Sequence, residues 1–228
     1  MLVAPLDCRA TFPPTMTRAL APLALALTLT ACSAMTQGGG VIESPVRDWR
    51  AIATPDDRDR LRDWRNAFTS ALQSARAAGH AAEIAREGAL LEPDAALGGG
   101  PIPNGDYRCR VIKLGARSPG MLDYVGYPAF ICRIGPEAGG PAAGLQSFAK
   151  MTGSQRQIGL VFPGDAMRQI FLGTVVLGDE RRAMQYGRDQ ERDVAGFVER
   201  IGTNRWRMLM PKPHFESQID VLELTPTY

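Results

Sequence analysis

YRCRVIKL (residues 107–114) and FICRI (130–134) are the two stretches of sequence that decide the fold class of this chain. Tyr107, Cys109 and Val111 in the first stretch, and Phe130, Cys132 and Ile134 in the second, occupy every second position, which is the period of a β-strand with one apolar face. Cys109 and Cys132 lie on those faces. Pro119-Gly120, a favourable central pair for a type II turn, lies near the midpoint between the cysteines. The pattern predicts an antiparallel hairpin in which Cys109 and Cys132 are nearly opposite.

The cysteine count favours a disulfide bond between Cys109 and Cys132. The chain has four cysteines, and an even pair in the body of an exported protein is typically bonded. Closing this loop would stabilise the fold by roughly 3.4 kcal/mol on the chain-entropy model. The alternative is two buried free thiols. A zinc site is not expected, because no other cysteine lies in the body and the histidines are distant in sequence.

Further short strands fill residues 98–228, which we interpret as an antiparallel β domain. Turn signals such as Gly178-Asp179 and Gly202-Thr203-Asn204 separate these strands. No helical patterns are interleaved, so a parallel sheet is not expected. The predicted fold class is α+β and mostly antiparallel β, a helical N-terminal segment followed by a small meandering barrel or sandwich. The expected strands cover 107–114, 128–134, 146–152, 156–162, 169–177, 182–187, 194–201, 205–210 and 219–224.

Residues 48–97 form the helical segment. Thr54 is a suitable N-cap and Pro55 suits the first helical position, with acidic residues in the first turn. Gly79 is a natural helix end, and a second short helix is expected over 81–87. The helix should plug or flank the sheet; a partner-binding face is the alternative. Its apolar stripe, at helical spacing, comprises Leu61, Trp64, Phe68, Leu72 and Ala75.

The N-terminal region is expected to direct export. Residues 19–30 (ALAPLALALTLT) are apolar, follow Arg18 and precede small residues, which is the pattern of a secretory signal peptide. The run is shorter than the ~20 apolar residues that span a bilayer. We therefore assign residues 1–31 to a signal region. Residues 1–15 lack the character of its basic start, so we expect translation to begin at Met16 and 1–15 to be a mis-assigned start.

Cys32 is the predicted lipid-attachment residue. Leu29-Thr30-Ala31-Cys32 resembles the lipobox of bacterial lipoproteins, whose cysteine is acylated and becomes the new N-terminus. Two or three acyl chains give durable anchoring where one chain is marginal. Residues 32–47 would then be a tether. The protein is expected on the periplasmic side of the outer membrane, with the inner membrane or the soluble periplasm as alternatives.

The composition excludes several classes of function. A net charge of +2 gives no global case for nucleic acid. No phosphate loop, dinucleotide glycine fingerprint, nucleophile elbow or zinc-protease motif is present, so no cofactor, metal or catalytic residue is predicted. Asp189, Glu191 and Asp193 alternate as calcium ligands do, but arginines interleave them, and a charged surface loop is the preferred interpretation. His214 is expected on the surface.

Two groups of residues are candidate binding sites. Arg108, Arg110 and Arg133 would line the outer face of the predicted hairpin and are candidates for binding an anionic headgroup or glycan. Trp206, Met208 and Met210 alternate on one strand and are candidates for lining an apolar ligand cavity. For each group the alternative is structural, a solvated face and an ordinary core.

Long stretches of the chain resemble a bacterial family of unknown function, number 4893 in its naming scheme. The resemblance covers about residues 45–226 and implies an uncharacterised exported protein of Gram-negative bacteria, with no activity, cofactor or catalytic residue to transfer. It is carried by the helical DWRAIATPDDRDRLRDWR (48–65), then GDYRCRVIKLG (105–115), YPAFICRI (127–134), TGSQRQIG (152–159), IFLGTVVLGDE (170–180), VERIGTNRWRMLMPKP (198–213) and IDVLELTP (219–226).

Three functions are open from the sequence. The favoured one is a membrane-tethered periplasmic β domain that binds a small ligand or a periplasmic protein. The second is a structural or assembly component of the cell envelope. The third is an enzyme whose site no motif reveals. A deep polar cleft would favour an enzyme, a cavity around Trp206 a small-molecule binder, and a large exposed apolar patch a protein partner.

Overall fold

The computed structural model describes residues 42, 47–137 and 144–227, all within one compact unit, Met35–Tyr228. The predicted signal region (1–31), the lipid-attachment residue Cys32 and most of the predicted tether lie outside the described residues. None of the helices in these described ranges is both long and apolar enough to cross a membrane.

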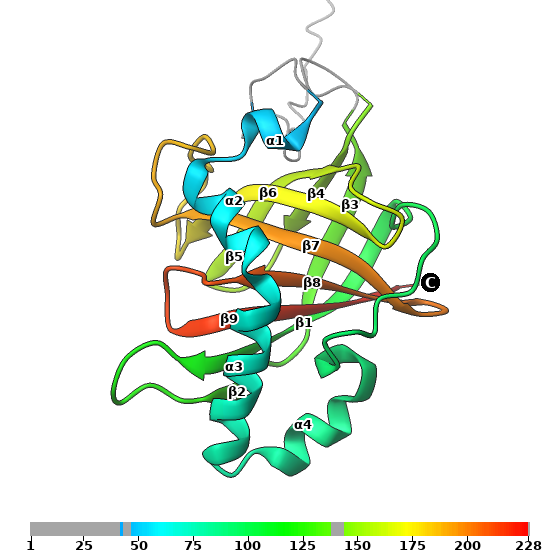
Figure 1. Cartoon of the computed structure of the whole chain (residues 1–228). Helices are drawn as coiled ribbons and strands as arrows, with labels where there is room; N and C mark the ends of the chain where they lie inside the picture. The colour runs from blue at the N-terminus through cyan, green and yellow to red at the C-terminus, as the bar shows by residue number, and fades with distance from the viewer. Residues whose placement is uncertain (1–41, 43–46, 138–143, 228) are drawn as a thin grey trace, which may run out of the picture. The chain divides into compact units, whose positions relative to one another are not determined.

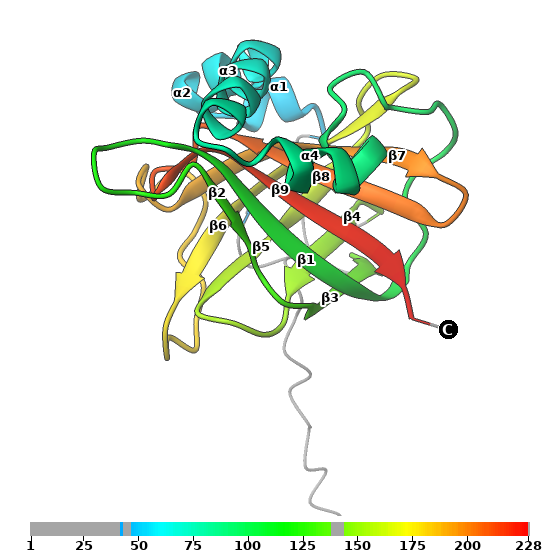
Figure 2. The same cartoon turned by 90° about the horizontal axis from the view of Figure 1, so that it is seen from below.

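Eight antiparallel strands close into a barrel (Figures 1 and 2). Each strand pairs with the next along the chain, and the last pairs with the first, Val111 lying opposite Leu222. A short additional strand, β2, pairs with the end of β1. The strands are β1 (Gly105–Ala116), β2 (Tyr124–Gly126), β3 (Phe130–Pro136), β4 (Gln146–Lys150), β5 (Gln155–Phe162), β6 (Arg168–Leu177), β7 (Asp193–Gly202), β8 (Arg205–Pro211) and β9 (Ser217–Pro226).

The predicted fold class is confirmed, and closure of the sheet decides for a barrel over a sandwich. Eight of the nine expected strands are present, but the strand expected over 182–187 is wrong. Those residues lie in a loop whose polar groups are satisfied locally. The carboxylate of Glu180 accepts from the Leu177 amide and pairs with Arg192, and Gly187 donates to Asp193. These contacts take the place of the backbone hydrogen bonds that a strand would form with a neighbouring strand.

The disulfide between Cys109 and Cys132 is confirmed. The two Cα atoms are 5.8 Å apart, within the usual range for this bond. In the β1–β3 pairing, Tyr107 lies opposite Cys132 and Cys109 opposite Phe130, so the bond joins neighbouring strands diagonally on the inner face. Gly120 has φ +88°, as the predicted turn requires, but the turn leads into β2 before the chain reaches β3.

Large side chains from all eight barrel strands fill the middle of the barrel. Phe148 and Phe171 meet edge to face with ring centroids 5.5 Å apart, and Met208 is fully buried beside them in the same cluster. Gly159 and Gly173 lie opposite each other on β5 and β6. A Cβ on Gly159 would come within 2.2 Å of the Leu172 carbonyl oxygen, so the strands could not approach as they do with any larger residue.

The helical segment flanks the barrel, on one side of it in both views (Figures 1 and 2). Thr54 caps α2 as predicted, accepting from the Asp57 amide. The single helix expected from Pro55 to Gly79 is divided at Asp63, so α2 contacts β7 while α3 contacts β1 and β9. The helices are α1 (Trp49–Ile52), α2 (Pro55–Arg62), α3 (Trp64–Ala77), α4 (Ala81–Glu87) and a 3₁₀ turn, η1 (Gly88–Leu91).

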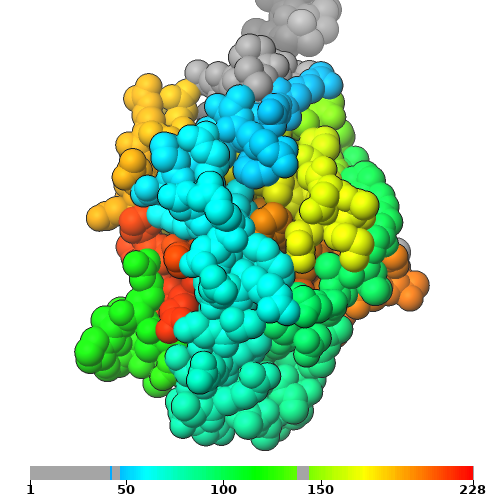
Figure 3. Space-filling view, viewed as in Figure 1, coloured from blue at the N-terminus to red at the C-terminus, as the bar shows by residue number. Residues whose placement is uncertain are grey.

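The apolar stripe of α3 is buried against the outer face of the barrel. Phe68 and Leu72 pack in one cluster with Ile112, Leu114 and Ile219. Burial of a side chain of this size contributes roughly 1.5–3 kcal/mol, so this contact is a large part of the fold's stability. In the space-filling view the helices form a continuous band over the strands (Figure 3). The helical segment therefore covers this face of the barrel wall.

Candidate functional site

One end of the barrel interior is polar. The inward-facing residues of β1 run from Tyr107 through Cys109 and Val111 to Lys113, so the alternation that builds the core carries a lysine to the end of the strand. Lys150 ends β4 in the same way, after the buried Phe148. We call this the lysine end; Lys113, Lys150, Gln157 and Asp220 define it.

Lys113 is neutralised by two carboxylates. It lies opposite Asp220 in the β1–β9 pairing, with Nζ 3.2 Å from Asp220 Oδ2 and 3.0 Å from Glu216 Oε2. It also donates to Gln155 Oε1 at 3.1 Å. Burial lowers the pKa of Lys113, but the charges of Asp220 and Glu216 outweigh burial and raise it. Lys113 is therefore a permanent cation committed to its own partners.

Lys150 is a buried cation of a different kind. Its residue is 4% exposed, yet among the described residues no carboxylate lies within ion-pair distance of Nζ. The ammonium donates to the Gln155 carbonyl at 2.8 Å and lies 3.7 Å from the centroid of the Phe130 ring. Burial and the charges of Lys113 and Arg156 lower the pKa of Lys150 to about 8. Its surroundings therefore destabilise the charged form of this side chain relative to the neutral form.

A pocket of about 160 Å³ opens beside Lys150. Val111, Tyr127 and Phe130 contribute apolar surface, and both lysines contribute charge. Gln157 also lines it; its Oε1 is buried and has no hydrogen-bond partner in the described part of the chain. A buried acceptor without a partner costs about 1–3 kcal/mol, so such groups in native proteins call for an explanation.

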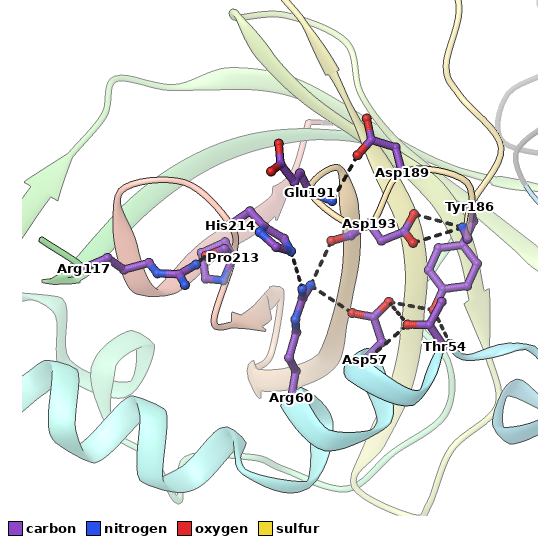
Figure 4. Close-up of polar contacts among 11 residues, drawn as sticks. Thr54, Asp57, Arg60, Arg117, Tyr186, Asp189, Glu191, Asp193, Pro213 and His214 are labelled. Atoms are coloured by element: carbon purple, nitrogen blue, oxygen red, sulfur yellow. Dashed lines mark hydrogen bonds and ion pairs between the residues drawn. The ribbon is translucent and has the colours of Figure 1, made fainter.

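A polar network joins α2 to neighbouring strands and loops of the barrel (Figure 4). Arg60 reaches from α2 to Asp57 at 3.1 Å, to the Asp193 carbonyl at 3.1 Å and to His214 Nε2 at 2.7 Å. The other oxygen of Asp57 accepts from the Tyr186 hydroxyl at 2.7 Å. The network thus ties the helix to β7, to the loop before it and to the β8–β9 loop.

The network fixes the protonation of its members. Burial raises the pKa of Asp193 to about 6, while the amide of Gly187 opposes that rise. Burial and the neighbouring Arg60 and Arg117 lower the pKa of His214, which keeps its ring neutral and able to accept from Arg60. Each polar group here has a partner within the protein. We therefore interpret the network as structural support for the lysine end.

The opposite end of the barrel holds a larger pocket of about 500 Å³. Trp206 lines it, whereas Met208 is fully buried in the core and Met210 faces the lysine end. The three residues predicted to line one cavity are thus distributed along the barrel. Charged side chains at this pocket are already engaged: Arg168 pairs with Glu199 at 2.5 Å, and Arg200 donates to the Gly98 carbonyl.

The three arginines predicted to bind anions lie on the outer face of the barrel. Arg110 is paired with Glu87 and Glu223, and Arg133 with Asp106. Arg108 is exposed. Because two of the three are neutralised, anion binding by this face remains a prediction for which the described contacts offer no built site.

The acidic loop adds no metal site. Within the described ranges, no group of three or more histidine, cysteine or acidic residues could hold a metal ion. Asp189 accepts from the Glu191 amide and pairs with Arg192, while Asp193 is buried and its own amide donates to the Asp189 carbonyl at 3.0 Å. His214, predicted on the surface, is instead half-buried against Arg60.

Sequence reasoning missed Lys113, Lys150 and Gln157. A usable signal was present, because only three of the 26 basic residues are lysine and two of those, Lys113 and Lys150, continue the apolar face of a strand near its end. Alternation alone placed Lys150 on the face of Phe148. It did not show that the loop after β4 folds back over the ammonium, where a Cβ on Gly153 would lie 2.8 Å from Nζ.

The fold and the pocket define a closed β-barrel protein with a polar, ligand-sized pocket at one end. The chain belongs to the family described as Domain of unknown function (DUF4893), which matches residues 49–224 and so covers both the helical segment and the barrel. This confirms the family resemblance. No curated protein and no solved structure matches the chain. The functional argument therefore depends on this chain's own residues.

Proposed function

We propose that the protein binds a small molecule at the lysine end of its barrel, and that it does so as a lipid-anchored protein on the periplasmic side of the outer membrane. The observation that carries the binding proposal is Lys150, a buried cation without a carboxylate partner among the described residues, beside a pocket that also holds the orphan acceptor of Gln157. Unsatisfied polar groups that converge on a concave, partly apolar pocket are typical of ligand sites.

The pocket has the parts that a binding site needs. Apolar walls supply the affinity that burial gives, and a few fixed polar groups supply orientation. The barrel is rigid here, because the disulfide closes β1 on β3 and the Arg60 network holds the surrounding loops. Sites built on strands hold their geometry better than sites on loops.

Sequence features support the tether. The apolar run at residues 19–30 and the lipobox-like motif ending at Cys32 are the pattern of a lipoprotein signal. The disulfide fits an oxidising compartment, where such bonds persist. If the tether is correct, Cys32→Ala moves the protein from the membrane pellet to a soluble or precursor form. Unchanged pelleting after a carbonate wash, with no lipid mass on the wild type, would refute the anchor.

The binding proposal is tested by nuclear magnetic resonance with a panel of neutral, cationic and anionic ring-sized compounds. We expect at least one compound to shift the resonances of Val111, Tyr127 and Phe130. Ser154→Trp, at the exposed rim of the pocket, should abolish those shifts. Ser118→Trp, on the exposed β1–β2 loop, should retain them. Shifts spread over the surface and unaffected by Ser154→Trp would contradict the proposal.

A further inference from the structure

We propose that the ligand of the lysine end is a small organic carboxylate that also carries a hydroxyl or N–H donor, with its carboxylate on Lys150 and its donor on Gln157. This inference rests on the proposed function and names the class of ligand. It concerns one juxtaposition on the inner face: an ammonium that lacks an anion and an amide oxygen that lacks a donor, on neighbouring strands.

The carboxylates around the pocket are unevenly shared between its two lysines. Five charged groups act at this end: Lys113, Lys150 and Arg156 against Glu216 and Asp220. Both carboxylates are committed to Lys113. Arg156 donates to backbone carbonyls of Gly153, Gly178 and Glu180, which leaves it without a counter-charge at this site. Lys150 is therefore the lysine of this pair that has no carboxylate within ion-pair distance among the described residues.

A monoanion suits the single ammonium of Lys150 better than a dianion. Transferring a second negative charge into the barrel would leave it unpaired, and burying an unpaired charge is strongly unfavourable. One carboxylate can accept two of the three protons of the ammonium, since the Gln155 carbonyl takes the third. This contact would also favour the charged form of Lys150 and so remove the strain on it.

The second recognition element lines the same pocket as the first. The β4–β5 ladder ends at the pair Ala149–Ile158. Lys150 and Gln157 are the next residues on the two strands, and both line the pocket. A single small molecule can therefore contact both. Its donor would satisfy Gln157 Oε1, which a simple carboxylate such as acetate would leave unpaired.

The size of the pocket limits the rest of the molecule. A cavity of about 150 Å³ accommodates one benzene ring, and the pocket beside Lys150 measures about 160 Å³. Its apolar lining, Val111, Tyr127 and Phe130, suits one flat ring or a short aliphatic chain. Long-chain fatty acids are too large to be buried there.

The inference is tested by calorimetric titration of the purified protein with 3-hydroxybenzoate and with 3-hydroxybenzyl alcohol, its uncharged counterpart. We expect the acid to bind at least tenfold more tightly than the alcohol. Lys150→Met should remove that preference while the alcohol still binds, and Lys150→Arg should restore it. Lys212→Met is the matched control, because Lys212 is half exposed and pairs with Asp63 outside the pocket; it should leave the preference unchanged.

The pH profile gives a second readout. Above pH 8 the free protein loses the proton of Lys150, so affinity for 3-hydroxybenzoate should fall by up to tenfold per pH unit, while Lys150→Met stays flat. Equal binding of acid and alcohol, or a preference that survives Lys150→Met, refutes the ligand class and leaves the binding proposal standing. Failure of 3-hydroxybenzoate to bind also refutes the class. The binding proposal itself fails if no compound of the panel perturbs the pocket, or if the shifts are spread over the surface and unaffected by Ser154→Trp.

Discussion

Replacing Lys150 by methionine should stabilise the folded protein at neutral pH. Burial and neighbouring cations hold the pKa of Lys150 at about 8 against an ordinary 10.5. Each pKa unit corresponds to about 1.4 kcal/mol, so keeping the ammonium charged costs the fold roughly 3 kcal/mol at most. Methionine avoids that cost but loses the hydrogen bond to Gln155, worth about 1 kcal/mol. Solvent at the pocket rim reduces the gain further, to a net of about 1–2 kcal/mol.

The effect has a defined pH dependence. The folded pKa of Lys150 is lower than the unfolded one, so between pH 8 and 10.5 the unfolded chain binds more protons than the folded protein. Stability of the wild type therefore rises with pH across this window relative to Lys150→Met. The advantage of the variant is present at pH 7 and disappears near pH 10.5.

Thermal denaturation of the wild type, Lys150→Met and the exposed control Lys212→Met checks this prediction at pH 7 and at pH 10. At pH 7 the melting temperature of Lys150→Met should rise by about 2–8 °C for a domain of this size. Lys212→Met should change stability by less than about 1 kcal/mol, as is usual for an exposed ion pair. A Lys150→Met protein less stable than the wild type at pH 7 would show that the lysine supports the fold, and the reasoning above would be wrong.

Three further predictions concern the frame around the pocket. Reduction of the Cys109–Cys132 bond should lower the free energy of unfolding by about 2–4 kcal/mol in urea titrations, and the oxidised protein should show no free thiol when denatured; two reactive thiols would contradict the bond. Arg60→Met should cost about 3–5 kcal/mol, because it leaves the fully buried carboxylate of Asp57 without its cation; a loss below 1 kcal/mol would show that the network is dispensable. Burial raises the pKa of Asp193 to about 6, so the folded protein binds this proton more tightly than the unfolded chain does. The free energy of unfolding should therefore fall by about 1–2 kcal/mol as pH rises from 4 to 6. An Asp193→Asn protein with the same pH dependence would refute that assignment.

The elements that could be predicted from sequence are those with strong local signals. Strict alternation placed the strands around Cys109 and Cys132, and the Thr54-Pro55 start fixed the beginning of α2. The strand predicted over 182–187 was wrong, because the mixture of apolar and charged residues there resembles the alternating pattern of a strand. What decides there is the set of hydrogen bonds made by Glu180 and Asp193, which lie outside the stretch itself.

The division of the helix at Asp63 had no local signal. Trp64 and Phe68 continue the apolar spacing of Leu61, so the pattern reads as one helix. The break is set by the barrel, because α2 and α3 pack on different strands and one straight helix would not follow both. Asp63 also forms an ion pair with Lys212 on the β8–β9 loop, a contact between distant parts of the chain.

The candidate site depended on tertiary structure for the same reason. The pairing of Lys113 with Asp220 follows from closure of β1 on β9, which joins residues more than one hundred positions apart along the chain. Sequence spacing cannot show that two carboxylates serve Lys113 and none serves Lys150. Conversely, the sequence suggested that Arg110 and Arg133 were free to bind an anion, but in the fold both form ion pairs with carboxylates.

The most direct test of the account is the titration of Lys150 itself. The chain has three lysines, so protein labelled with carbon-13 at the lysine Cε position gives three resonances that single substitutions can assign. The account predicts that the Lys150 resonance titrates near pH 8, and that saturating 3-hydroxybenzoate moves its midpoint up by a unit or more while Lys212 does not respond. A Lys150 midpoint near its ordinary value, unmoved by 3-hydroxybenzoate, would contradict the claim that this lysine is held in the barrel for an anionic ligand.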